Sequence, residues 1–261
     1  MLVKVSVENF KSFDKAAELT MISSNKIRTN ANHRLKIKST QLLKYAVVYG
    51  ANASGKTNLA LLFKFFKDSV CNGIPIEATQ MFCKNRQENK ERESSFEIQI
   101  TVGDKFYAYG FSAVLSRRKV TGEWLYELYQ NGSAKCLFER EGSKRPVLND
   151  GITLTNTEKN KFETYADDFE GNETSLFLTE MNRGKKYSTR SKLLFFRDVY
   201  DWIQNHISII TPDTPLIDLE YYYDDNSLKL INKLIKTFDT GISQVKIEEI
   251  TLDELSNAMP K

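Results

Sequence analysis

Apolar and polar residues alternate at the start of the chain. Val3, Val5 and Val7 fall on one side of LVKVSVENF, and a period of two is typical of a strand with one buried face. AAELTMIS, residues 16–23, predicts a second strand after a turn near Asp14. The polar and basic stretch 23–41 has no clear period and predicts a loop.

A buried strand and a helix are predicted on either side of residue 50. LLKYAVVYG, residues 42–50, is a short apolar run rich in β-branched and aromatic residues, which predicts a central strand covered on both faces. The stretch GKTNLALLFKFFKDSV then predicts a helix. One apolar stripe at helical spacing would pack against a sheet; it consists of Leu59, Leu62, Phe63 and Phe66.

From residue 94 the pattern changes to short alternating strands. SSFEIQITV, KFYAYGFSAVL, EWLYELYQNG and AKCLFERE predict an antiparallel layer with hairpin turns at Gly103-Asp104 and Asn131-Gly132. The charge run 84–93 before it predicts a solvated loop. Farther on, periodicity predicts a short buried segment at 175–181, helices over 191–206 and 226–241, and a closing strand at 242–250.

Composition sets the broad class. The chain is 41% hydrophobic and 27% charged with a net charge of +3, a balance typical of a soluble globular protein and too even to indicate a nucleic-acid partner. Its longest purely apolar runs are too short to span a bilayer, so we expect no membrane partner. Three cysteines form no C-x-x-C pair and no signal peptide is recognisable, which favours reduced thiols in a cytoplasmic protein.

A phosphate-binding motif lies between the predicted central strand and its helix. Residues 50–57, GANASGKT, fit G-x-x-x-x-G-K-[ST]. Two glycines would let successive N–H groups point at an anion, and the helix start adds its positive end. We expect Lys56 to reach the β- and γ-phosphates of ATP and Thr57 to ligate Mg²⁺. The predicted nucleotide-binding residues are Gly50, Ala51, Asn52, Ala53, Ser54, Gly55, Lys56, Thr57 and Asn58.

The residues around this motif resemble the ABC-type ATPases of the SMC/RecF group. Members commonly carry an NFKSF-like end to the opening strand, here residues 9–13, and an asparagine at the third motif position, here Asn52. The closer resemblance is to bacterial AAA-family ATPases of the OLD-like kind, often linked to phage defence, in which YGANASGKSN follows a strand that ends in tyrosine. Here YGANASGKTN carries Thr57 as the permitted variant. The resemblance is specific over residues 1–70 and looser beyond.

The resemblance implies an α/β fold, the P-loop NTPase fold of an ABC-ATPase head, with an αβα core and an antiparallel β subdomain. We therefore divide the chain into a first part of the ATPase core at 1–93, a β subdomain at 94–140 and a mixed segment at 141–261 that leads towards a missing C-terminal half. It also implies that Lys11 and Ser12 lie near the nucleotide and that two heads sandwich two ATP molecules. The implied partners are a second head or a chain carrying the C-terminal half, with DNA and a nuclease as further candidates.

Motifs for hydrolysis are not recognisable. A Walker B candidate, Asp253-Glu254, follows a strand interrupted by Glu248, Glu249 and Thr251, and no ABC signature is found. His206 fits a packing role better than that of a switch histidine, and SLFLTEMNR and Gln80 are poor Q-loop candidates. The catalytic residues therefore stay unassigned. The resemblance places the missing motifs after a helical insertion, so we interpret the chain as a truncated frame, a fragment or one half of a split protein.

Two functional classes stay open. The chain is an ATP-binding portion of an ATPase in a DNA-linked or phage-defence process, or a regulatory module that binds nucleotide without hydrolysing it. A GTPase fits poorly, because NKIR at Asn25 precedes the motif and lacks the aspartate of a guanine reader. Phe10 and Phe13 fill the core or flank adenine, and the basic stretch 183–192 is a solvated loop or touches a nucleic-acid backbone. The strand aromatics pack in the layer or stack on bases; they are Tyr107, Tyr109, Trp124, Tyr126 and Tyr129.

Overall fold

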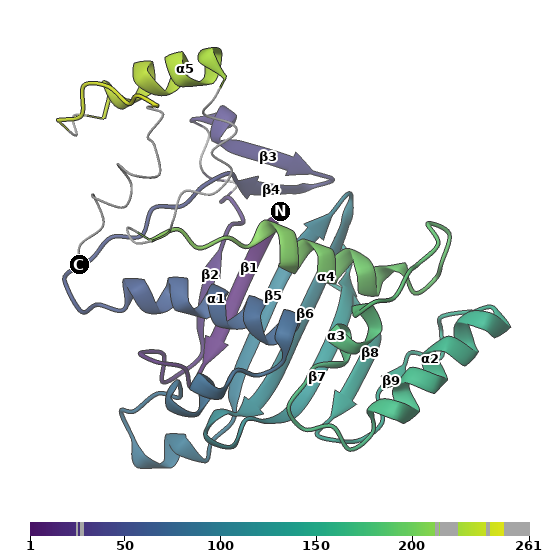
Figure 1. Cartoon of the computed structure of the whole chain (residues 1–261). Coiled ribbons are helices and arrows are strands. Elements are labelled where there is room, and N and C mark those ends of the chain that lie inside the picture. The colour runs from purple at the N-terminus through teal and green to yellow at the C-terminus, as the bar shows by residue number, and fades with distance from the viewer. Residues whose placement is uncertain (25, 27–28, 212–213, 215–223, 239–240, 248–261) are drawn as a thin grey trace, which may run out of the picture. The chain divides into compact units, whose positions relative to one another are not determined.

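An antiparallel sheet of seven strands dominates the computed structural model (Figure 1). The structure describes residues 1–24, 26, 29–211, 214, 224–238 and 241–247, and it divides into two units, 1–209 and 210–261. The sheet belongs to the first unit. Its strands, in spatial order, are β2 (Ala17–Thr20), β1 (Leu2–Glu8), β5 (Ser94–Val102), β6 (Lys105–Val114), β7 (Lys119–Leu128), β8 (Ala134–Glu141) and β9 (Val147–Leu148).

The predicted β layer is confirmed and is larger than expected. β5 to β8 occupy the predicted segments, while the opening strand β1 joins the same sheet by pairing with β5, from Leu2↔Ile100 to Glu8↔Ser95. Residue 93 is therefore not a break in the sheet, and the division of the chain at residues 93 and 140 stays a prediction. Val3, Val5 and Val7 are buried, as the alternation predicted.

Helices cover one face of this sheet (Figure 1). They are α1 (Lys56–Asn72), α3 (Phe177–Asn182) and α4 (Leu194–His206), while α2 (Asn156–Phe169) lies beside β8 and β9 and packs against α3. Helix α1 confirms the predicted helix, although its buried residues include Phe65 and Val70 beside the expected Leu62 and Phe66. The buried segment at 175–181 and the helix near 191–206 are confirmed as α3 and α4.

Phenylalanine rings join α1 to the sheet. Phe65 lies 4.9 Å from Phe96, and Phe66 lies 5.4 Å from Phe111, measured between ring centroids. Phe10, fully buried, stacks on the same group at 5.2 Å from Phe65. Phe10 is therefore a core residue, which agrees with the interpretation that it fills the core rather than flanks adenine. Tilted and edge-to-face rings at these distances add to the free energy of burial.

A buried carboxylate joins the sheet to α3. One oxygen of Glu123 on β7 accepts hydrogen bonds from the Tyr109 hydroxyl and the Leu178 N–H, both at 2.9 Å, and the other accepts from the Phe177 N–H at 2.6 Å. The side chains of Glu123 and Arg140 are wholly buried, with 3.9 Å between their charged groups. Arg140 in turn donates to main-chain oxygens of Lys144 and Ser175. The start of α3 is thereby fixed to the centre of the sheet.

Two local predictions before the P-loop are wrong. Residues 34–43 form a hairpin rather than a loop: β3 (Arg34–Ile37) pairs with β4 (Thr40–Leu43), after a short 3-10 turn at Ala31–His33. Residues 44–50 form no strand, and Val47 and Tyr49 are 74% and 89% exposed. No described strand pairs with residues 44–50, so their apolar side chains have no sheet to pack in.

The second unit contains α5 (Asp225–Ile235), which confirms the helix predicted near 226–241. Its start is capped by Asp224, whose carboxylate accepts from the Ser227 N–H at 3.0 Å. Residues 242–247 form no strand, contrary to prediction; instead the Asn232 side chain exchanges two hydrogen bonds with the main chain of Val245. Residues 248–250 and the Asp253-Glu254 pair lie outside the described residues. None of the described helices is both long and apolar enough to cross a membrane.

Candidate nucleotide-binding site

The P-loop forms a tight turn that ends in the first residue of α1. The Ser54 N–H donates to the Ala51 carbonyl at 3.2 Å, and Ala53 and Gly55 take left-handed backbone conformations with φ of 64° and 93°. Turns of this handedness bring successive N–H groups onto one concave side, which is the geometry that binds anions.

Two glycines of the motif stand where a side chain would collide. A Cβ on Gly50 would lie 2.9 Å from Ser54 Oγ, and a Cβ on Gly55 would lie 2.7 Å from Ser12 Oγ. Contacts under 3.0 Å force something to shift. Each close atom is the hydroxyl oxygen of a serine, which a rotation of that side chain would move away, so the firmer requirement for glycine is the positive φ at Gly55.

The lysine of the motif lies over the loop. Lys56 Nζ donates to the carbonyl oxygens of Gly50 and Ala51, both at 2.7 Å, and sits 3.4 Å from Ser54 Oγ. A single ammonium thus holds a position above the concave turn. A triphosphate held by the loop would meet this charge directly.

The start of α1 carries no side-chain cap, because its N-cap residue is Gly55. The first N–H groups of a helix have no partner within the helix, and together with the helix dipole they favour an anion. Thr57, the predicted Mg²⁺ ligand, is exposed one residue into the helix. The donor set therefore fits a phosphate group with its divalent cation: turn amides, a lysine, a helix start and a threonine hydroxyl.

The NFKSF turn lies against the P-loop. Phe10 and Phe13 exchange two main-chain hydrogen bonds, N to O at 2.9 and 2.8 Å, which closes a four-residue turn. At its tip the Ser12 hydroxyl accepts from Asn58 Nδ2 at 2.9 Å. The structure thus brings Ser12 to Gly55 and Asn58, from a position more than forty residues earlier in the chain. Lys11, with φ of 51°, is held by its N–H to the Met81 carbonyl at 2.7 Å.

A cavity of about 380 Å³ opens beside the P-loop. Its polar side is formed by Gly50, Ser54, Gly55 and Lys56, and its apolar side comes from β1, β2, α1 and the segment before the motif. Phe13 and Val48 are among the apolar lining residues. The motif therefore borders a partly apolar space rather than open solvent alone.

Comparison with known families assigns the chain. The family model described as "AAA domain, putative AbiEii toxin, Type IV TA system" matches residues 46–256. The chain belongs to this AAA family. No curated protein matches it. Membership confirms the α/β P-loop NTPase fold and implies nucleotide binding, and AAA domains of this type generally use ATP and Mg²⁺.

Other candidates lie away from the P-loop of this AAA domain. Thr179 is buried on α3, where its hydroxyl donates to the Val70 carbonyl at the far end of α1, and Glu180 pairs with Lys185. His206 stacks on Trp202 at 5.6 Å, a packing contact. Among the described residues, no group of three His, Cys, Asp or Glu side chains could hold a metal ion.

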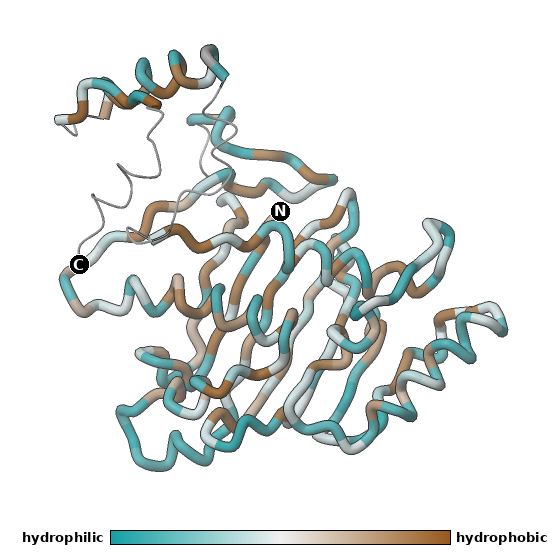
Figure 2. Tube along the Cα trace, in the orientation of Figure 1, coloured by the Kyte–Doolittle hydropathy of each residue, from teal (hydrophilic) through white to brown (hydrophobic). Residues whose placement is uncertain are grey.

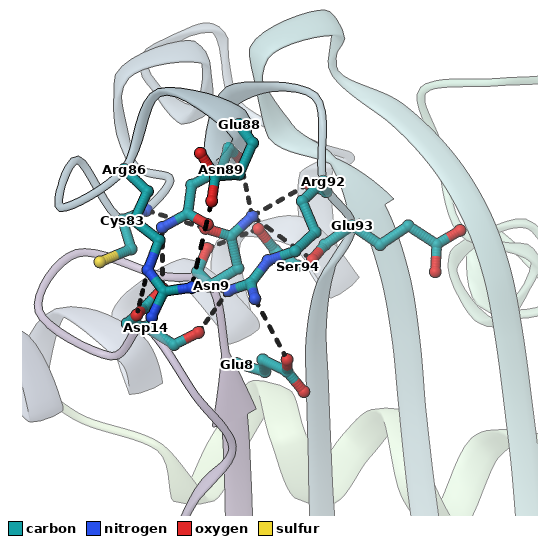
Figure 3. Close-up of polar contacts among 10 residues, drawn as sticks. All are labelled: Glu8, Asn9, Asp14, Cys83, Arg86, Glu88, Asn89, Arg92, Glu93 and Ser94. Carbon is teal, nitrogen blue, oxygen red and sulfur yellow. Dashed lines mark hydrogen bonds and ion pairs between the residues drawn. The ribbon is translucent and has the colours of Figure 1, made fainter.

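The NFKSF turn is supported by contacts that the sequence did not predict, although it placed Asn9 in the motif and a turn near Asp14. The residues are Asn9, Asp14, Asn89 and Arg92 (Figure 3). Asn9 directly follows β1 and is fully buried, at a position where the alternation of Val3, Val5 and Val7 would place an apolar residue. Asp14 accepts from Asn89 Nδ2 at 2.9 Å and lies near Arg86 and Arg92. The hydrogen bond from Asn89 has the largest effect and lowers the pKa of Asp14; desolvation opposes it, and the charges of Arg86 and Arg92 lower the pKa further. An asparagine directly after an alternating strand was the available signal.

Proposed function

We propose that the chain binds Mg·ATP at the P-loop and is an ATPase-type head of the OLD/SMC/RecF-like group. One observation carries the proposal: the turn at 50–55, Lys56 above it and the uncapped start of α1 place three kinds of anion-binding group at one point. In this arrangement residues 50–58 hold the phosphates and Thr57 ligates Mg²⁺, which supplies charge neutralisation at the β- and γ-phosphates.

Hydrolysis in such a head needs carboxylates and a signature motif from elsewhere. We propose that a second head, or a chain carrying the C-terminal half, supplies them and covers the exposed residues before the P-loop. The exposed apolar side chains of Tyr45, Val47, Val48 and Tyr49 support this, because contiguous exposed apolar residues mark interaction surfaces. A role in phage defence, or in a DNA-linked process with a nuclease, follows only from the resemblance and the family description.

Nucleotide-dependent stabilisation tests the binding site. At one hundred times its dissociation constant, Mg·ATP should add about 2.7 kcal/mol to the free energy of unfolding, a rise of roughly 5–10 °C in melting temperature for a chain of this size. Lys56→Ala should abolish the rise, measured by differential scanning fluorimetry. Lys64→Ala, which removes a positive charge from the same helix on an exposed side chain, is the matched control and should keep it. An undiminished rise in Lys56→Ala would place the site elsewhere.

A regulatory module that binds but does not hydrolyse ATP is the second candidate. The sequence supports it, because no Walker B strand without polar interruption and no ABC signature are recognisable. Phosphate release separates the two: steady release by the purified chain that disappears in Lys56→Ala identifies an ATPase, whereas binding without release identifies the module.

A further inference from the structure

Asn9 sits where β1 ends and the NFKSF turn begins, and every polar atom of its side chain is used. Its Nδ2 donates to the carbonyl oxygens of Asn89 and Arg92, both at 2.9 Å, and its Oδ1 accepts from the Cys83 N–H at 3.2 Å (Figure 3). Its own carbonyl accepts from Ser94 Oγ at 2.6 Å. One buried side chain therefore fixes three points of the segment 83–92 to the end of β1.

The other end of the turn is tied to the same segment. Asp14 accepts from Asn89 Nδ2 and lies 3.3 Å from Arg92 Nη2 and 3.4 Å from Arg86 Nε, while Arg92 also donates to the Asp14 carbonyl. The charged loop 84–93 is largely hydrophilic (Figure 2) and was expected to be only a solvated connection. It is instead the anchor for both ends of the NFKSF turn.

The anchored turn is held in an unfavourable backbone conformation. Asn9 and Lys11 both have φ of 51°. Asparagine tolerates this left-handed region better than most residues, whereas lysine adopts it only at a cost in free energy. Such conformations persist where surrounding contacts enforce them. The conformation that these contacts enforce is that of the tip of the turn. There, Ser12 Oγ lies beside Gly55, in the space that a Cβ on Gly55 would enter, and it accepts a hydrogen bond from Asn58 Nδ2.

We propose that Asn9 is a positioning residue for the P-loop. Together with the Asp14–Arg92 pair it clamps the NFKSF turn onto the segment 83–94, so that Ser12 holds Gly55 and Asn58, and with them the start of α1, in the conformation that binds phosphate. The role in binding rests on the proposed function, whereas the role in shaping the P-loop does not. Asn9 touches no P-loop residue in the contacts above and acts through Ser12.

Hydrogen exchange tests the positioning role without nucleotide. In Asn9→Gly, which accepts the positive φ but lacks the side chain, the amides of residues 55–58 should exchange about tenfold faster than in the unaltered chain. Ser12→Ala should have the same effect. Asn182→Ala is the matched control: Asn182 is a buried asparagine on α3 that donates to the Leu178 and Phe196 carbonyls. It should lower the melting temperature while leaving exchange at residues 55–58 unchanged. Unchanged exchange in Asn9→Gly overturns the proposal.

Nucleotide affinity then tests how Asn9 acts. Calorimetric titration with Mg·ATP should show about tenfold weaker binding for Asn9→Gly and for Ser12→Ala. The double variant should bind no more weakly than either single variant, because both remove the same support. Multiplied effects would mean that Asn9 does not act through Ser12 and would overturn the proposal. Should Asn9→Gly fail to fold, Asp14→Asn is read in its place, with an expected loss of about threefold that vanishes in the Ser12→Ala background.

The two proposals fail in different ways. If the unaltered chain does not bind Mg·ATP, or if Lys56→Ala binds as tightly, the nucleotide site is refuted while the exchange result still decides whether Asn9 shapes the loop. If binding is normal and depends on Lys56 but not on Asn9 or Asp14, only the positioning role is refuted.

Discussion

Strand β6 and the segment before the P-loop have similar compositions and opposite environments. Residues 106–111, FYAYGF, are all buried, and residues 45–49, YAVVY, are largely exposed. β6 lies between β5 and β7, paired on both edges, with α1 over one face. Residues 45–49 have no described strand on either edge. The residue types of both segments suit a strand, so it is the neighbours, and not the apolar pattern, that decide which one is buried.

The difference has a consequence for the nucleotide site. The rear of the P-loop is held by the buried sheet and its aromatic cluster, through α1 and the NFKSF turn. The approach to the loop from residue 45 has no such support. The stability of the isolated chain should therefore respond to changes on the sheet side and be insensitive to changes at 45–49.

The largest expected effect is on the sheet side. Phe111→Ala empties a fully buried position between Phe66, Phe65 and Phe96 and should lower the free energy of unfolding by about 4 kcal/mol, as for other buried aromatic truncations. Tyr49→Ala is the matched change in the other segment, and because Tyr49 is exposed it should alter stability by less than about 0.5 kcal/mol. Urea unfolding measures both. Comparable losses in the two variants would show that residues 45–49 are packed in solution.

The next effect concerns the buried carboxylate. Glu123→Gln replaces an acceptor of three hydrogen bonds by an amide whose NH₂ group faces donors, and it leaves Arg140 without its buried counter-charge. We expect a loss of about 3 kcal/mol. Glu141→Gln, which removes an exposed pair with Lys144 at 2.7 Å, should leave stability nearly unchanged. Equal losses by chemical denaturation would mean that burial of the Glu123 pair contributes nothing.

Sequence patterns predicted the elements whose burial is decided locally. The alternation in β5 to β8 gave the strands, and the apolar stripe gave helix α1 with two of its buried residues, Leu62 and Phe66, because neighbouring segments of the chain supply the partners. The prediction of a strand at 42–50 was wrong because an apolar run does not show whether a partner strand is present, and no neighbouring segment supplies one. The hairpin at 34–43 was missed because its residues show no period, with Leu42 the only one that is fully buried.

The site was predictable only in part. The P-loop follows from its motif. The structure places Ser12 beside Gly55 and Asn58, while the implied position of Lys11 and Ser12 near the nucleotide stays a prediction. The role of residues 83–92 could not be read from the chain. KNRQENKERE has the composition of a solvated loop, and only the structure shows that its main-chain carbonyls and Arg92 surround Asn9 and Asp14.

The smallest expected effect on stability concerns helix capping, and it compares a helix start that has a side-chain cap with one that has none. Glu158 caps the start of α2, where its carboxylate accepts from the Thr155 N–H at 3.0 Å. The same carboxylate accepts from the Lys192 N–H and the Ser191 hydroxyl, both at 2.8 Å. Helix α1 has no side-chain cap. Partial burial acts to raise the pKa of Glu158, but the hydrogen bonds from Thr155, Ser191 and Lys192 outweigh it and lower that pKa to about 2. The folded pKa lies below the unfolded value, so this stabilisation is present above about pH 4.5 and is lost as the pH falls towards 2.

Glu158→Gln should therefore lower the free energy of unfolding by about 1 kcal/mol at pH 7, and the gap to the unaltered chain should narrow as the pH falls from 4.5 to 2. Urea unfolding at a series of pH values measures it. Glu163→Gln, on the same helix with a looser 3.8 Å contact to Lys159, is the control and should change stability by less than about 0.5 kcal/mol. If the difference in free energy of unfolding between Glu158→Gln and the unaltered chain stays constant with pH, the Glu158 carboxylate does not stabilise the start of α2. The starts of α1 and α2 would then not differ in side-chain capping.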